Sequence, residues 1–395
     1  MKICQVSPRF PYKEHLEGKA IEKSYPVGGV SQVVYHLSKE LSQLDNDVTI
    51  ITTKSPRHYD LSEPYLKNVT IRRVPIDIRF FSSSLIALRM FKSLIPSEYD
   101  VIHAHTPVPL AAEIAALRNI RKKSPFILSY QNDMCKEGFL GNIATMVYRS
   151  TFGRFLLKHS DAIITSTKSY AVNSKPLARY LHKVKTIPNG VDITRFHQKI
   201  DGSVIKRKHS LDKSSKVLLY AGRLELYKGC DYLVRAVAAA IKELPQVYLI
   251  LVGIGPEEAR LRAIAKELGI DSNIIFAGFV SDEDLPYYYA ACNVFVLPSV
   301  SSLEGFGIVQ LEAMACGKPV VTTTLPGPSE VDAEEVATIH VPPKDTEALA
   351  NAVTKILSHE DLAKKMGENG RKLVEAKYTW SKIARDILSI YQGLM

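Results

Sequence analysis

Residues 294–312 read Val-Phe-Val-Leu-Pro-Ser-Val-Ser-Ser-Leu-Glu-Gly-Phe-Gly-Ile-Val-Gln-Leu-Glu. The stretch begins with four apolar residues that predict a buried strand, passes through a polar turn, and continues from Ile308 with helical spacing. A strand, a short turn and a helix in this order form the repeating unit of a parallel sheet covered by helices.

The same alternation of apolar strands and helical patterns occurs along the whole chain. Nearly continuous apolar strands are typical of parallel sheets that are buried on both faces. We therefore predict an α/β protein with two Rossmann-like, doubly wound parallel sheets facing a central cleft, with ligands beyond the carboxyl ends of the strands. The predicted strands are Ile3–Ser7, Val48–Thr52, Thr70–Val74, Val101–His105, Phe126–Tyr130, Ala162–Thr165, Val184–Ile187, Lys216–Tyr220, Val247–Val252, Ile274–Phe276, Val294–Leu297 and Val320–Thr323.

The length of 395 residues exceeds what one ordinary core holds. The polar and basic stretch Asp192–Ser215 interrupts the alternation and marks a boundary. We predict an N-terminal domain over residues 1–195, a C-terminal domain over 196–377 and a terminal helix over 378–395. Trp380, Ile383 and Ile387 have helical spacing, so this last helix must pack on another part of the protein.

Cysteine usage and apolar runs indicate the compartment. The five cysteines are scattered and form no CxxC pair, which argues against a disulfide framework and against a cysteine zinc site. A reducing cytoplasm fits best. The N-terminal apolar stretch is too short for a signal peptide, and no run approaches a membrane span. We expect a cytoplasmic protein, with peripheral contact on the inner face of the membrane.

The charge is uneven between the two halves. Residues 1–200 carry 29 Lys and Arg against 16 Asp and Glu, whereas residues 201–395 carry 22 against 25. A basic half attracts an anionic partner, although solvated surface lysines are an equal alternative. The single tryptophan and the absence of interleaved aromatic and basic residues argue against a nucleic-acid partner.

Residues Phe80–Ile95 combine apolar side chains with Arg79, Arg89 and Lys92. The pattern predicts an amphipathic helix, which either packs on the sheet or lies on a bilayer. With the basic first half, it favours transient contact with anionic lipid.

The turn and helix start at residues 304–312 suit a diphosphate. Glycines let a backbone approach a ligand closely, and the first amides of a helix lack partners within the helix. They also face the positive end of the helix dipole. A carboxylate beside a diphosphate would repel it, so Glu304 and Glu312 should instead bind hydroxyls: Glu304 those of a transferred sugar, Glu312 those of a ribose.

Two glutamates with seven residues between them resemble the signature of the retaining family-4 glycosyltransferases of the GT-B fold. The resemblance covers essentially the whole chain. It implies transfer of a sugar from a nucleotide diphosphate donor without a metal or another cofactor, and a terminal helix that crosses back to the first domain. Ala221-Gly222-Arg223-Leu224 with Lys228-Gly229 resembles the Gly-Arg…Lys-Gly segment of the family, whose cations stabilise the leaving diphosphate.

Further matches assign the rest of the site. Gly28-Gly29 resembles the N-terminal glycine pair of the family, and the polar stretch Pro8–Pro26 resembles its mobile acceptor-side loop. Gly278-Phe279-Val280 matches the position that holds the nucleotide base. Ile187–Asp192 also resembles a family segment, but we expect a structural turn there. The predicted donor-binding residues are Gly28, Gly29, Gly222, Arg223, Lys228, Gly253, Phe279, Val280, Phe306, Gly307, Ile308, Val309 and Glu312.

One departure concerns Gln131, which stands where family members often carry a histidine. Glutamine can bond a sugar hydroxyl but cannot move a proton. A front-face mechanism, in which the leaving phosphate oxygen takes the acceptor's proton, needs no such base. The resemblance thus implies Arg223, Lys228, Glu304 and Gln131 as catalytic residues, with His105 and Asn132 on the acceptor side.

His103 and His105 lie on one face of a predicted strand. A zinc site needs a third ligand, and no residue is spaced to supply one. A structural or acceptor-side role is favoured.

The sequence predicts a retaining, metal-independent hexosyltransferase that acts in envelope or polysaccharide biosynthesis. A UDP-sugar is slightly favoured over a GDP-sugar, and a glycan or lipid-linked acceptor over a small soluble one. The enzymatic alternatives are an epimerase or a sucrose- or trehalose-phosphate type synthase. A sugar-nucleotide-binding or scaffold protein that has lost catalysis is the other alternative, favoured only by Gln131.

Overall fold

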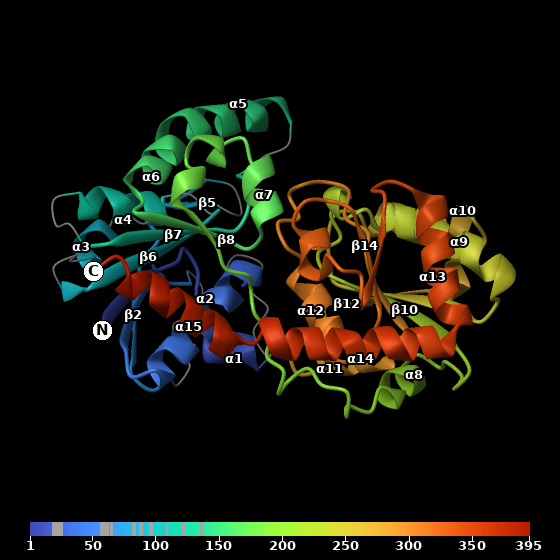
Figure 1. Cartoon of the computed structure of the whole chain (residues 1–395). Coiled ribbons are helices and arrows are strands. Elements are labelled where there is room, and N and C mark those ends of the chain that lie inside the picture. Colours follow the sequence, from blue (N-terminus) through green and yellow to red (C-terminus); the bar gives the residue numbers. More distant parts are fainter. Residues whose placement is uncertain are drawn as a thin grey trace. The chain divides into compact units, whose positions relative to one another are not determined.

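The computed structural model describes residues 1–17, 27–55, 63, 66–80, 84–86, 90–94, 98–107, 110–120, 124–134 and 138–395. The chain divides into two compact units (Figure 1). The first comprises Met1–Asn189 together with Trp380–Met395, and the second is Gly190–Thr379. Residues 18–26 of the predicted acceptor-side loop lie outside the described residues.

The first unit contains a parallel sheet of seven strands in the order β3-β2-β1-β6-β7-β8-β9. The strand order reverses between β1 and β6, and such a switch point opens a crevice at the carboxyl ends of the strands. The strands are β1 (Lys2–Val6), β2 (Asp47–Thr53), β3 (Val69–Val74), β6 (Val101–Thr106), β7 (Phe126–Tyr130), β8 (Ala162–Thr165) and β9 (Val184–Thr186).

Helices of the first unit pack on this sheet, and α2 contacts the terminal helix α15. The ring of His36 on α2 stacks on Trp380 of α15, with centroids 5.3 Å apart. The helices are α1 (Lys13–Leu16), α2 (Gly29–Gln43), α3 (Met90–Ser93), α4 (Ala111–Asn119), α5 (Phe139–Tyr148), the π-helical turn η2 (Arg149–Gly153), α6 (Arg154–His159), α7 (Lys168–Asn173) and α15 (Trp380–Gln392).

The predicted helix over Phe80–Ile95 is wrong. In its place β4 (Ile78–Phe80) and β5 (Ser84–Ile86) pair antiparallel, and among the described residues of this stretch only the short α3 is helical. Residues 81–83, 87–89 and 95–97 lie outside the described part. Serines disfavour a helix interior because their hydroxyls compete for backbone hydrogen bonds, and three of them occupy positions 82–84. The structure therefore does not support a membrane-binding helix over residues 80–95.

The second unit contains a parallel sheet of six strands in the order β12-β11-β10-β13-β14-β15. The strands are β10 (Lys216–Ala221), β11 (Val247–Val252), β12 (Ile274–Gly278), β13 (Val294–Leu297), β14 (Val320–Thr323) and β15 (Thr338–Val341). Its helices are α8 (Ser203–Lys208), α9 (Cys230–Glu243), α10 (Glu258–Glu267), α11 (Leu285–Ala291), α12 (Ile308–Ala315), α13 (Thr346–Ser358) and α14 (Glu360–Lys377).

The core of the second unit lies on both faces of its sheet. Along β10, Leu218 and Tyr220 pack into one apolar cluster, whereas Val217, Leu219 and Ala221 pack into the other. Because successive side chains of a strand point to opposite faces, the two clusters lie on opposite sides of the sheet. The predicted doubly wound α/β fold with two parallel sheets is confirmed.

A buried polar network attaches the end of the chain to the first unit. The hydroxyl of Tyr391 on α15 lies 2.6 Å from Nδ1 of His103 and accepts from the Gln5 amide at 3.2 Å. Nε2 of His103 lies 2.8 Å from the Ser129 hydroxyl. Burial holds the pKa of His103 well below its ordinary value, with the neighbouring ring of His105 adding to the effect. The last helix is therefore bonded directly to strands β1 and β6, and through His103 to β7.

Candidate functional site

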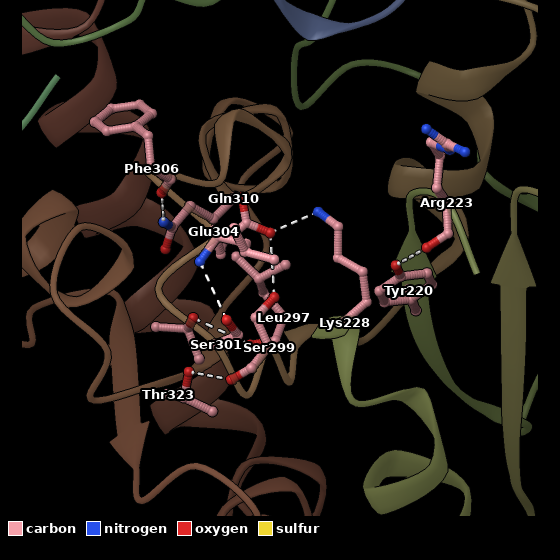
Figure 2. Close-up of polar contacts among 12 residues, drawn as sticks. Tyr220, Arg223, Lys228, Leu297, Ser299, Ser301, Glu304, Phe306, Gln310 and Thr323 are labelled. Carbon is pink, nitrogen blue, oxygen red and sulfur yellow. Dashed lines mark hydrogen bonds and ion pairs between the residues drawn. The ribbon is translucent and has the colours of Figure 1, made fainter. Parts of the chain in front are cut away.

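An ion pair between Lys228 and Glu304 forms the centre of the candidate site (Figure 2). The ammonium of Lys228 lies 2.6 Å from Oε2 of Glu304, and the Ser299 hydroxyl donates to the same oxygen at 3.1 Å. The two charged side chains are only 15% and 10% exposed, so water screens their attraction weakly. The structure thus brings together two residues that are 76 positions apart.

Glycine at position 229 permits this pairing. Its φ of +66° is left-handed, and a Cβ there would lie 2.2 Å from the Pro298 carbonyl oxygen. The amide of Val300 also donates to the Tyr227 carbonyl at 2.9 Å. The segment carrying Lys228 can therefore lie directly against the turn that leads to Glu304.

Lys228 is held in its charged form. Burial by itself would lower the pKa of Lys228, but the Glu304 carboxylate and Tyr227 together raise it above its ordinary value. An ammonium has three donors, and one of them reaches Glu304. A charged lysine with further donors can bind phosphate oxygens as well.

Glycines and a buried glutamine shape the loop between Glu304 and α12. Gly307 is the N-cap of α12 with φ +78°, and a Cβ on Gly327 would meet the Gly305 carbonyl oxygen at 2.4 Å. The amide of fully buried Gln310 donates to the carbonyls of Phe306 at 2.7 Å and Pro328 at 3.2 Å. Sequence reasoning missed Gln310. Its position in the first turn of α12 could have indicated that its side chain bonds the backbone of the preceding loop.

Of the predicted donor residues in this loop, Phe306 is buried and packs against the ring of Tyr378 at 6.2 Å. Its side chain is therefore part of the core, and only its backbone faces the loop. Ile308 and Val309 are partly buried against the same core. Their backbone amides are at the start of α12, where a helix has no internal acceptors for them.

Arg223 does not join the Lys228–Glu304 pair. Its side chain is 74% exposed and its guanidinium bonds Glu225 at 2.6 Å, and Figure 2 shows it pointing away from Glu304. The backbone of this turn is tightly packed, since a Cβ on Gly253 would lie 1.9 Å from the Gly222 carbonyl oxygen. An exposed arginine on a rigid turn can still swing toward a bound phosphate.

Glu312 lies half-buried in α12 and accepts a hydrogen bond from the Tyr289 hydroxyl of α11 at 2.6 Å. Burial raises the pKa of the Glu312 carboxyl, while the bond from Tyr289 and the charge of Arg195 oppose this increase. The tyrosine is fully buried and therefore fixes the orientation of the carboxylate. Sequence reasoning did not identify Tyr289, because its partner lies 23 residues away.

Phe279 follows β12 and its ring is 48% exposed, whereas the neighbouring Val280 packs against the core. Gly278, the last residue of β12, has φ +67°, which turns the chain at this point. An exposed aromatic ring on a fixed turn can stack on a planar base.

We expect Phe279→Ala to weaken nucleotide binding by about tenfold, since stacking on a base contributes about 1–3 kcal/mol. The melting temperature without ligand should change little because the ring is exposed. Calorimetric titration with the nucleotide diphosphate measures the effect. Tyr287→Ala, which removes an exposed ring from α11, is the matched control, and equal losses in both variants would contradict the assignment.

The residues predicted in the first unit occupy three separate places. Gly28 and Gly29 begin α2, and no atom of the described residues lies within 4 Å of an added Cβ, so packing against this part of the chain does not require glycine there. Gln131 accepts from the Asn189 amide at 3.2 Å, and Asn132 lines a pocket with Tyr130 and Met134 beyond the end of β7.

His105 is fully buried, and its Nε2 lies 2.6 Å from the Gln5 side-chain oxygen. Burial lowers the pKa of His105 to about 3, so the ring is neutral at physiological pH. A neutral, enclosed imidazole does not favour the predicted acceptor contact. Within the described residues, His103, His105 and all other His, Cys, Asp and Glu side chains form no group of three that could hold a metal ion.

Membrane spans are also absent from the described residues: none of their helices has the length and apolar character to cross a bilayer.

Comparisons with known proteins agree with this architecture. Residues 27–195 match the model of glycosyltransferase family 4, and residues 202–373 match that of the glycosyl transferases group 1. An uncharacterized glycosyltransferase of Methanocaldococcus jannaschii is 31% identical, over 93% of this chain and 95% of that protein. The O-antigen chain mannosyltransferase C of Escherichia coli is 27% identical, over 93% of this chain and 95% of that protein.

Solved structures show the same fold. Sucrose-phosphate synthase from Thermosynechococcus elongatus has a TM-score of 0.75 at 23% identity, covering 100% of this chain and 98% of that one. Anabaena HepE in complex with UDP has a TM-score of 0.75 at 19% identity, covering 100% of both chains. The two parallel sheets are those of the GT-B class. The chain belongs to the glycosyltransferases of group 1 and family 4.

Proposed function

We propose that this protein is a retaining hexosyltransferase that moves a sugar from a nucleotide diphosphate donor to a glycan or lipid-linked acceptor without a metal ion. The observation that carries the proposal is the buried ion pair of Lys228 and Glu304 beside the start of α12. A cation, a carboxylate and unbonded helix amides can bind a diphosphate and a sugar next to each other.

Each group has a separate role in the proposed transfer. Lys228, Arg223 and the first amides of α12 stabilise the negative charge that builds on the leaving diphosphate. Glu304 bonds hydroxyls of the transferred sugar, and Glu312 bonds the ribose. Within the described residues, Gly28 and Gly29 leave space at the start of α2 for a phosphate, and Phe279 stacks on the base.

The proposed transfer retains the configuration of the sugar at its anomeric carbon. The leaving phosphate oxygen takes the proton of the acceptor hydroxyl as the new glycosidic bond forms on the same face. Gln131 bonds a sugar hydroxyl and takes no part in proton transfer, because an amide does not titrate. The cation and the helix amides supply the charge stabilisation that a metal supplies in other transferases.

The relatives support an acceptor in polysaccharide assembly. The E. coli protein is an O-antigen chain mannosyltransferase, and a relative from Pseudomonas aeruginosa, 28% identical, is a D-rhamnosyltransferase. HepE is known in complex with UDP, which supports a uridine donor here. We place the protein in the cytoplasm with peripheral contact at the membrane. A sugar-nucleotide-binding protein without catalysis is the alternative, supported only by Gln131.

Binding of UDP, GDP and ADP to the purified protein, each with and without EDTA, tests the donor site by thermal shift. A ligand present at 100 times its Kd stabilises the folded state by about 2.7 kcal/mol. We expect UDP to raise the melting temperature equally with and without EDTA. A shift that EDTA abolishes and manganese restores would contradict metal independence, and no shift with any nucleotide would favour the non-catalytic alternative.

A further inference from the structure

A cluster of exposed apolar side chains lies on the helical segment 139–159, which comprises α5, η2 and α6. Ile143, Met146, Val147 and Phe152 expose 41%, 65%, 51% and 52% of their surface. The first three are spaced three and four residues apart, so they share one face of α5. No other stretch of ten described residues holds more than two such side chains. Clusters of this kind mark interaction surfaces, whereas single exposed apolar residues do not.

The opposite face of the same segment is firmly packed. The hydroxyl of Tyr148 donates to the buried carboxylate of Glu113 on α4, and Arg149 donates to the Met134 carbonyl at 2.9 Å. Leu156 and Leu157 on α6 are buried in the core. Figure 1 shows α5 at the rim of the first unit, with α6 leading back to the sheet. The apolar cluster is therefore displayed on an anchored element.

The charge of the segment has one sign. Residues 139–159 include Arg149, Arg154, Lys158 and no Asp or Glu. Arg154 and Lys158 are exposed. A second copy of the chain docked symmetrically on this face would place these cations near their own equivalents, which repel. An anionic lipid bilayer offers both the apolar interior and the negative surface that the segment fits.

We propose that the α5–α6 surface, defined as Ile143, Met146, Val147, Phe152, Arg154 and Lys158, docks onto an anionic lipid bilayer. The apolar side chains enter the boundary between headgroups and acyl chains, and the two cations bind lipid phosphates. The docking itself does not depend on the sugar transfer proposed above.

One consequence does rest on the proposed function. Tyr148, Arg149 and Gly153 of the same segment line a pocket with Tyr130 and Asn132, beyond the carboxyl end of β7. A lipid-linked acceptor held in the bilayer under α5 would therefore present its headgroup close to this edge of the sheet.

Sedimentation of the full-length protein with vesicles tests the docking. We use phosphatidylcholine vesicles with and without phosphatidylglycerol, and compare the wild type with two double variants. Met146→Ser with Val147→Ser should weaken binding to anionic vesicles by at least about tenfold, since two apolar side chains leave the bilayer. Arg154→Glu with Lys158→Glu should weaken it by at least about tenfold on anionic vesicles and change little on neutral ones.

Val204→Ser is the matched control, because Val204 is 42% exposed at the start of the basic helix α8 in the second unit. Unchanged melting temperatures show that the variants fold, and light scattering reports the oligomeric state. No binding of the wild type to either vesicle would overturn the proposal. So would an equal loss in Val204→Ser, or a dimer that the Met146 and Val147 substitutions dissociate. Loss of vesicle binding with unchanged UDP binding supports the docking even if the transfer activity proves different.

Discussion

Glu304→Gln is expected to lower the turnover number of sugar transfer by about 10²–10³ while nucleotide binding persists. Glutamine keeps the size of the side chain and an oxygen that can accept from Lys228, but it removes the charge that bonds the sugar in the transition state. A loss of about 1–3 kcal/mol in unfolding free energy is expected as well, because the 15% exposed ammonium of Lys228 keeps only a neutral partner. Steady-state kinetics and denaturant unfolding measure the two effects.

The matched control is Glu334→Gln, which removes one negative charge from an exposed position of the same unit. Its turnover and its unfolding free energy should equal those of the wild type within experimental error, since exposed substitutions change stability by less than about 0.5 kcal/mol. Turnover of Glu304→Gln within a factor of three of the wild type would contradict the assigned role. If Glu304→Gln instead abolishes the rise in melting temperature that UDP causes, Glu304 would be assigned to donor binding.

Lys228→Met is expected to weaken binding of the nucleotide diphosphate by at least about tenfold and to lower transfer by about 10²–10³. Methionine matches the apolar stem but cannot neutralise a leaving diphosphate. The variant leaves the Glu304 carboxylate 10% exposed with the Ser299 hydroxyl as its remaining side-chain donor, so stability should fall too. Combining it with Glu304→Gln should cost less stability than the sum of the single changes, because neither charge is then stranded. An additive result would show that the two residues do not act as a pair.

The pH dependence of this pair has a definite sign. The pKa of Lys228 is raised in the folded protein, so the folded state binds its proton more tightly than the unfolded chain does. Its contribution is therefore complete below the unfolded value of about 10.4 and is lost as the pH rises through the raised folded value. The difference in unfolding free energy between the wild type and Lys228→Met should be constant from pH 6 to 9 and decrease only at higher pH. A decrease already present between pH 7 and 9 would contradict this.

Local sequence pattern was sufficient for most of the fold. The bounds of β7, β8, β11, β13 and β14 match the predicted ranges, because apolar strands between helices are a short-range signal. Strand β15 (Thr338–Val341) was missed, since its alternation of apolar and polar residues is short. Helix α14 contains Gly367 and Gly370, although glycine inside a helix normally lowers its stability. Here a Cβ on Gly367 would meet the Gly317 carbonyl oxygen at 2.1 Å, so the glycine serves the close packing of two helices.

The candidate site shows where local pattern stops being informative. Lys228 and Glu304 were both named from motifs, but their ion pair depends on Gly229 and on the turn at Pro298, which approach each other only in the folded sheet. The periodicity of the sequence does not reveal the partners Tyr289 and Ser299. The Tyr289 hydroxyl bonds Glu312 on the next helix, and the Ser299 hydroxyl bonds Glu304 across a turn. The roles of the site residues stay predictions, which the variants described above test.

The membership of α15 in the first unit has a consequence for the order in which the protein is made. The second unit is continuous from Gly190 to Thr379, whereas the first unit needs both the start and the last sixteen residues of the chain. Domains fold as units while the ribosome elongates the chain. A nascent chain that ends at Thr379 already holds every strand of the second unit, but its His103 still lacks the Tyr391 hydroxyl. The unit translated first is thus completed last, because its seven-stranded sheet gains α15 only after the whole second unit has been made.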